Sequence, residues 1–152
     1  MNSKLMLLRP WWYCEVIALP LVSAHTLFNR ARQEISMLQQ FFIQLSVEPQ
    51  SISFEQSISL IDALYHFTPT AFKNGDLHNA AGENNGSCKI LAFGLLHQLS
   101  EPQTLHLFGD YYRQVLETPQ ADDHQNIRNF IRTGWGGVEF TQLALQEKTP
   151  QP

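Results

Sequence analysis

Apolar residues recur at three- and four-residue intervals through most of the chain, as they do on one face of an amphipathic helix. The first such stripe lies between Asn29 and Leu45 and comprises Ile35, Leu38, Phe41, Phe42 and Leu45. The same criterion predicts helices over residues 53–66, 87–99, 101–117 and 122–132, and a weak last helix around Leu143. The pattern therefore predicts a mainly helical protein of about five helices.

Polar residues mark where several of these helices begin and end. Ser53, Ser100 and Asp122 each stand three residues before a glutamine, which is the spacing of a capping box. Gly134 follows the last clear helix, and a glycine at positive φ commonly ends one. The starts and the end are thus predicted independently of the apolar stripes.

The predicted helix 87–99 has apolar residues on more than one face, which is typical of a helix that is packed from several sides. Gly94 in its interior costs about 1 kcal/mol relative to alanine, so it indicates a close crossing with another segment. The helix follows a small, polar stretch, Ala80–Gly86, that contains two glycines. We therefore place this helix at the centre of the fold, with a glycine-rich loop leading into it.

The helical pattern is interrupted at residues 67–78. Asn74-Gly75 is a strong hairpin signal, and it predicts a small β-hairpin or extended pairing here. Residues 137–140 are a candidate further partner. The predicted fold is a single, mainly α domain around helix 87–99 with this small β element.

The chain divides into three parts. Residues 1–36 form a leader, residues 37–147 a helical domain, and residues 148–152 a frayed tail. The leader is interpreted as a peripheral helix, or as the product of a mis-assigned start with Met37 as the alternative. Its Val22-Ser23-Ala24 pattern also fits a signal peptide, although Glu15 and Pro10 interrupt the apolar stretch.

Composition and charge narrow the function classes. The 152 residues are 43% hydrophobic and 16% charged, which is typical of one folded domain. The net charge is −4, and it is −6 from Met37 onward, which argues against a nucleic-acid partner. No apolar run reaches the roughly 18 residues of a transmembrane segment. Cys14 and Cys88 lie in unlike segments, so we predict two free thiols and a cytoplasmic protein, with secretion as the alternative.

The first candidate site is the junction between the loop and helix 87–99. A thiol in the first turn of a helix has a lowered pKa, which makes Cys88 a candidate nucleophile beside the positive Lys89. Candidate bases are His66, His78, His97 and His124. The same position also suits a small buried side chain that closes the junction.

The loop is also a candidate ligand site. Asn84, Asn85, Ser87 and Lys89 surround the helix start, and glycine-rich loops before helices present backbone amides to phosphate. The alternative is a loop whose asparagines bond to their own backbone as Asx-turns.

A second candidate surface consists of Arg128, Arg132 and Trp135. The two arginines share one helix face, and with the tryptophan they could bind a carboxylate ligand or a partner protein. Pairing with nearby carboxylates is the alternative. Short clusters such as Asp122-Asp123-His124 lack the spacing of a metal motif, so we expect no metal and no cofactor.

Three blocks of the sequence carry a resemblance to a known family. They are FTPTAFKNGDLHNAAGENNGSCKILAF (67–93), LFGDYYRQVLETP (107–119) and HQNIRNFIRTGWGGVEF (124–140). With weaker similarity back to about Met37, the chain resembles the HopJ type III effector family. The resemblance implies a bacterial protein, and it brings no reaction, cofactor or catalytic residue with it.

The sequence therefore predicts a small HopJ-like protein that binds an unidentified protein or small molecule, with secretion as an effector left open. The alternative function is an enzyme with a thiol-dependent site at residues 84–89.

Overall fold

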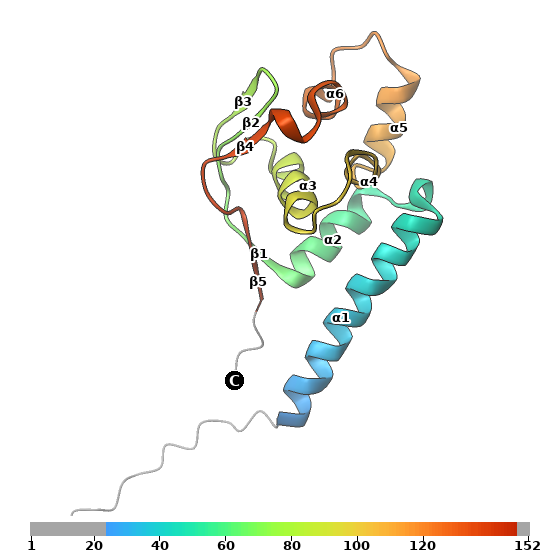
Figure 1. The fold of residues 1–152 in the computed structure, drawn as a ribbon, viewed down its shortest axis with the longest axis vertical. Coiled ribbons are helices and arrows are strands. Elements are labelled where there is room, and N and C mark those ends of the chain that lie inside the picture. The colour runs from blue at the N-terminus through green and yellow to red at the C-terminus, as the bar shows by residue number, and fades with distance from the viewer. Residues whose placement is uncertain (1–23, 149–152) are drawn as a thin grey trace, which may run out of the picture.

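The computed structural model describes residues 24–148, and Figure 1 shows their arrangement. Within this part of the chain lie six α-helices: α1 (Ala24–Val47), α2 (Phe54–Leu64), α3 (Asn85–Leu96), α4 (Glu101–His106), α5 (Asp110–Glu117) and α6 (Gln125–Thr133). Two short 3₁₀ helices, Pro49–Ser51 and Gly134–Gly137, follow α1 and α6. The prediction of a mainly helical domain is confirmed.

The core is built around α3, as predicted. Ile90, Leu91 and Phe93 have no exposed surface, and α2 and α4 pack against this helix. A side chain at Gly94 would place its Cβ 2.7 Å from the Thr104 hydroxyl oxygen and 2.9 Å from the ring of Trp135. The close crossing inferred from this glycine is therefore present, and it brings α4 and the segment after α6 against α3.

Five short strands form two antiparallel sheets. Strands β2 (Phe72–Asn74) and β3 (Leu77–Asn79) form the predicted hairpin, and β4 (Val138–Phe140) pairs with the other edge of β2. Strand β1 (Tyr65–Phe67) pairs with β5 (Leu145–Glu147). The expected role of residues 137–140 as a further partner is thus confirmed over Val138–Phe140.

Three local predictions are wrong. The predicted helix 101–117 is divided into α4 and α5 because Gly109 adopts φ +56°, where a Cβ would meet the Phe54 backbone nitrogen at 2.3 Å. The weak helix around Leu143 is instead the approach to β5, whose pairing with β1 outweighs local preference. Asp122 does not cap α6, since the N-cap position is occupied by His124.

Helix α1 begins inside the segment interpreted as a leader. Figure 1 shows its first half extending past the other helices, and it exposes Phe28 and Ile35. The interpretations of residues 1–23 and 149–152 lie outside the described residues. Within residues 24–148, no helix is both long and apolar enough to cross a membrane.

Candidate functional site

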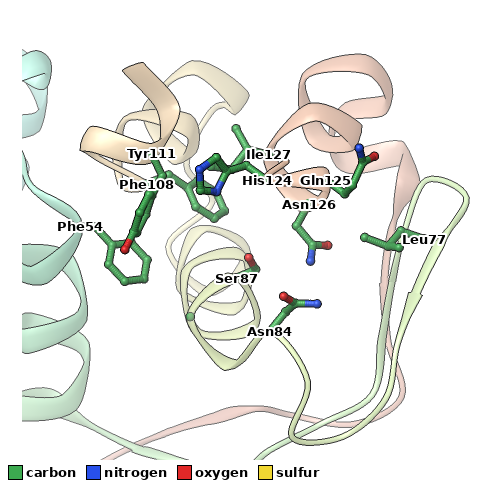
Figure 2. Close-up of a pocket in the computed structure, with 11 residues that line it drawn as sticks. Phe54, Leu77, Asn84, Ser87, Phe108, Tyr111, His124, Gln125, Asn126 and Ile127 are labelled. Atoms are coloured by element: carbon green, nitrogen blue, oxygen red, sulfur yellow. The ribbon is translucent and has the colours of Figure 1, made fainter. Parts of the chain in front are cut away.

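A cavity of about 500 Å³ lies where the first turns of α3 and α6 approach each other. Its walls come from four helices and the hairpin (Figure 2). The lining residues are Phe54, Leu77, Asn84, Gly86, Ser87, Phe108, Tyr111, His124, Gln125, Asn126 and Ile127. Segments that are up to about 70 residues apart in the sequence therefore contribute to one site.

The start of α3 leaves its backbone donors open. Asn84, the N-cap, is left-handed at φ 48° and ψ 43°, and its side chain makes no capping hydrogen bond. The first amides of a helix have no partner within it, and those of Asn85, Gly86 and Ser87 find none elsewhere in residues 24–148. Gly86 and Ser87 line the cavity, so the positive end of α3 faces it.

Helix α6 begins in the same way. His124, its N-cap, is left-handed at φ 47° and ψ 42°, again without a capping bond from its side chain. The amides of Gln125 and Asn126 have no partner within the described part of the chain. Two helices with the same unusual start thus direct their N-termini at one cavity.

A group of asparagines, all buried except Asn84, holds these two starts together. The Asn79 side-chain oxygen accepts hydrogen bonds from Asn84 at 2.7 Å and from Asn126 at 2.9 Å. Asn74 donates to the Asn126 carbonyl at 2.7 Å and to its side-chain oxygen at 3.1 Å, and Asn129 donates to the Asn74 carbonyl at 3.1 Å. Asn79 therefore links β3 to α3 and α6 through a single oxygen atom.

The loop residues predicted as a ligand site do not all face the cavity. Asn84 and Ser87 line the cavity, and Asn85 supplies one of the open amides. Lys89 instead points away, with its ammonium 2.6 Å from the Asp62 carboxylate and over the ring of Phe67. The loop thus lines the cavity with Asn84, Gly86 and Ser87 but not with Lys89.

The candidate nucleophile Cys88 lies in the core. Only 1% of its surface is exposed, and its thiol donates to the Thr70 carbonyl oxygen at 3.6 Å. Burial raises the pKa of the Cys88 thiol, against a smaller lowering effect of the Thr70 bond. These surroundings stabilise the protonated thiol.

One candidate base for Cys88 lies far from it. His97 follows nine residues later in the chain, which corresponds to about 13 Å along a helix axis. Its Nε2 lies 2.7 Å from the Tyr65 hydroxyl oxygen, and burial lowers the pKa of His97. This histidine belongs to the aromatic packing around Phe93, not to a pair with the thiol.

The residues of the second predicted surface, Arg128, Arg132 and Trp135, each have hydrogen-bond partners within the protein. Arg128 binds Asp123 at 2.6 Å, Arg132 binds the Asn129 side chain at 2.5 Å, and the Trp135 ring nitrogen donates to the Leu99 carbonyl at 2.9 Å. The Trp135 ring packs edge to face against Phe130 of α6. The three side chains therefore serve three separate contacts.

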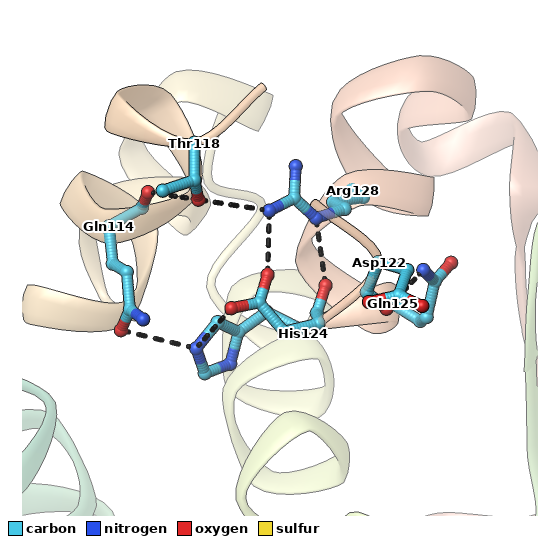
Figure 3. A network of polar contacts seen from close by, with 7 residues as sticks. Gln114, Thr118, Asp122, His124, Gln125 and Arg128 are labelled. Atoms are coloured by element: carbon cyan, nitrogen blue, oxygen red, sulfur yellow. Dashed lines mark hydrogen bonds and ion pairs between the residues drawn. The ribbon is translucent and has the colours of Figure 1, made fainter. Parts of the chain in front are cut away.

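The Arg128–Asp123 pair affects the electrostatics of the cavity. The Arg128 guanidinium donates to the Asp123 carboxylate just before the first turn of α6 and to the Thr118 hydroxyl, and Figure 3 shows the guanidinium between Thr118 and the start of α6. Its hydrogen bond lowers the pKa of the Asp123 carboxyl, which is also close to His124. Because a cation neutralises this carboxylate, it offers little opposition to a negative ligand at the α6 amides.

Metal ligands do not converge anywhere in residues 24–148, where no group of three or more His, Cys, Asp or Glu side chains is placed to hold an ion. The cavity itself is lined by amide, hydroxyl, imidazole, aromatic and aliphatic groups.

Comparisons with known proteins find one matching family and one similar solved structure. Residues 38–145 match the sequence model of the HopJ type III effector protein family. The chain belongs to this family. A crystal structure of the unknown-function protein VPA0580 is 53% identical, with a TM-score of 0.72, and the similarity covers 73% of this chain and 93% of that one. Among curated proteins, none matches the chain.

Membership of the HopJ family confirms the resemblance seen in the sequence. The matched residues include every residue that lines the cavity, whereas the first half of α1 lies before them. Neither the family description nor the similar structure names a reaction or a ligand. The function is therefore inferred from the geometry of the cavity.

Proposed function

We propose that this HopJ protein binds a small anionic ligand, a phosphate or carboxylate compound, in the cavity between α3 and α6. The observation that carries the proposal is the convergence of two uncapped helix N-termini on one cavity. Their first turns offer the open amides of Gly86, Ser87, Gln125 and Asn126. Such amides, at the positive ends of helices, are a common way to bind an anion.

Side chains complement the backbone donors. The Ser87 hydroxyl makes no hydrogen bond within the described residues and lies on the cavity wall, so it can donate to a ligand oxygen. The imidazole of His124 lies on the same wall, 26% exposed, and can donate from a ring nitrogen. Neutral donors are sufficient here because the helix dipoles supply the positive potential.

The volume and lining of the cavity support a small molecule as the ligand more than a partner protein. Cavities of roughly 300–1,000 Å³ are typical of small-molecule sites, and this cavity lies within that range. Its lining mixes polar donors with aromatic walls, which is the usual composition of such sites. Export as an effector stays a prediction from the sequence, since residues 24–148 carry no feature that bears on it.

The alternative of a thiol-dependent enzyme gains no support from the geometry. A nucleophilic thiol needs access and a lowered pKa, whereas Cys88 is buried and its pKa is raised. Ser87, its neighbour, faces the cavity instead.

Titration with methyl phosphate, followed by backbone amide NMR, tests the proposal. The amides of Gly86, Ser87, Gln125 and Asn126 should shift together along one saturating curve, and Ser87→Ala should weaken binding about 3- to 10-fold. Ser59→Ala, an exposed serine of α2, is the matched control and should leave the affinity unchanged. Shifts of equal size at the capped starts of α2 and α4, or none at α3 and α6, would overturn the proposal.

A further inference from the structure

We infer that the ligand of this cavity also carries a flat ring, which lies against the aromatic wall made by Phe54, Tyr111 and His124. The ligand class is then an aryl phosphate or aromatic carboxylate and not a small inorganic anion. This inference rests on the proposed function for the anionic part, while the ring has evidence of its own in the size and the aromatic lining of the cavity.

The aromatic wall is continuous. The rings of Phe54 and Tyr111 meet edge to face with centroids 4.9 Å apart, and the Tyr111 and His124 rings lie 5.0 Å apart at 38°. Figure 2 shows Phe54 and Tyr111 on one side of the cavity, with Asn84, Asn126 and Leu77 across from them. Tyr111 retains 39% of its surface exposed, so its partners do not cover it completely.

The size of the cavity separates the two ligand classes. A phosphate group fills roughly the volume of three water molecules at about 30 Å³ each, or about 90 Å³. The cavity of about 500 Å³ holds several times that volume. A phosphate at the amides would therefore leave most of the cavity unfilled, and a flat apolar group that packs on the aromatic side chains gains free energy by leaving water.

The ring wall directly adjoins the amides of α3. A Cβ at Gly86 would come within 2.7 Å of the Phe54 ring, so the backbone and the ring are in contact at this glycine. An anion held by the Gly86 and Ser87 amides therefore lies next to the aromatic surface. This proximity favours a ligand whose anionic group is attached to its ring directly or through one atom.

Phenyl phosphate and methyl phosphate provide the test, because they carry the same phosphate group and differ only in whether a phenyl ring or a methyl group is attached to it. Titration of the full chain by calorimetry should show phenyl phosphate binding at least tenfold more tightly. Tyr111→Leu should remove this preference, so that the affinities for phenyl phosphate and methyl phosphate come to lie within about a factor of two of each other. Tyr111→Phe, which retains the ring, should keep the preference, and Tyr112→Leu is the control because the Tyr112 ring packs on His106 instead of lining the cavity.

Neutral phenol separates this inference from the proposed function. Phenol should compete with phenyl phosphate and shift the side-chain signals of Tyr111, even if methyl phosphate does not bind and the anion proposal fails. Equal affinities for methyl and phenyl phosphate would overturn the inference and leave anion binding intact. A preference for phenyl phosphate that survives Tyr111→Leu would overturn the assignment of the ring to this wall.

Discussion

Two pairs of helix N-termini in this protein are built on opposite principles. Helices α2 and α4 have capped starts: Ser53 accepts from the Gln56 amide, and Ser100 forms a complete capping box with Gln103. Helices α3 and α6 have open starts, with left-handed N-caps and no side-chain cap. The capped starts satisfy their own donors, whereas the open starts present theirs to the cavity.

The difference indicates where the proposed binding site lowers the stability of the helix starts. A serine cap contributes about 1 kcal/mol, and a non-glycine residue in the left-handed region costs up to roughly 1–2 kcal/mol, with less expected for asparagine than for histidine. The open starts lack the stabilisation of a serine cap and carry the cost of a left-handed residue. Both positions, Asn84 and His124, line the same cavity. The buried asparagines supply a compensating set of hydrogen bonds just behind them.

The largest effect is expected from removing the support of the open starts. Asn79→Ala leaves the amide groups of Asn84 and Asn126 without their shared acceptor, so we expect a loss of about 2–4 kcal/mol in the free energy of unfolding. Methyl phosphate binding should weaken as well. Urea denaturation measures the stability, and His78→Ala, an exposed change on the same strand, should cost less than about 0.5 kcal/mol. A loss at Asn79 no larger than at His78 would contradict the proposed support.

Cys88 and Ser87 divide the first turn of α3 between core and cavity. Cys88→Ala should lower stability by about 1–2 kcal/mol because a buried side chain is lost, with the phosphate affinity unchanged. In a Cys14-free background, the Cys88 thiol should react with a thiol reagent only after unfolding, because burial both shields it and raises its pKa. Fast modification of the native protein at neutral pH would restore the thiol-enzyme hypothesis.

A change at a capped start should affect stability alone. Ser100→Ala removes the hydroxyl that accepts from the Gln103 amide, while the backbone amide of residue 100 can still donate to the Gln103 side chain, and we expect a loss of about 1 kcal/mol. The affinity for methyl phosphate should stay the same, since α4 lies outside the cavity lining. A parallel loss of affinity would show that the two kinds of helix start are not independent.

The smallest effect is the release of strain at His124. Both His124→Ala and His124→Gly remove the imidazole, but only glycine adopts φ 47° without steric cost. We therefore expect the glycine variant to be more stable than the alanine variant by about 0.5–1 kcal/mol, as measured by thermal unfolding. Equal stabilities would mean that the helix start relaxes once the ring is gone.

Sequence patterns predicted the capped starts well because their cause is local. A serine three residues before a glutamine is sufficient to place both Ser53 and Ser100 correctly. Asp122 and Gln125 show the same spacing, yet here the Gln125 side chain donates to the Asp122 carbonyl in the turn before α6. The same pair of residue types thus serves a turn instead of a cap.

The open starts and the cavity were only partly predictable. Asn84 and Ser87 stood out because a glycine-rich loop precedes a helix, but nothing near His124 in the sequence indicates that α6 begins beside them. The contact depends on Asn79 and Asn126, which are 47 residues apart and look like ordinary loop and helix residues. Strand β5 was not predicted because it also depends on a contact between distant residues: its partner β1 lies about 80 residues earlier in the chain.

The pairing of β1 with β5 also shapes the order in which the protein can be made. All of α3 to α6 is synthesised between these two strands, so β1 has no partner until β5 follows at the far end of that segment. Closing a segment of this length costs about 4 kcal/mol of chain entropy, which has to be recovered by contacts formed late. During synthesis the edge of β1 is therefore a transient risk for misassembly with other nascent chains.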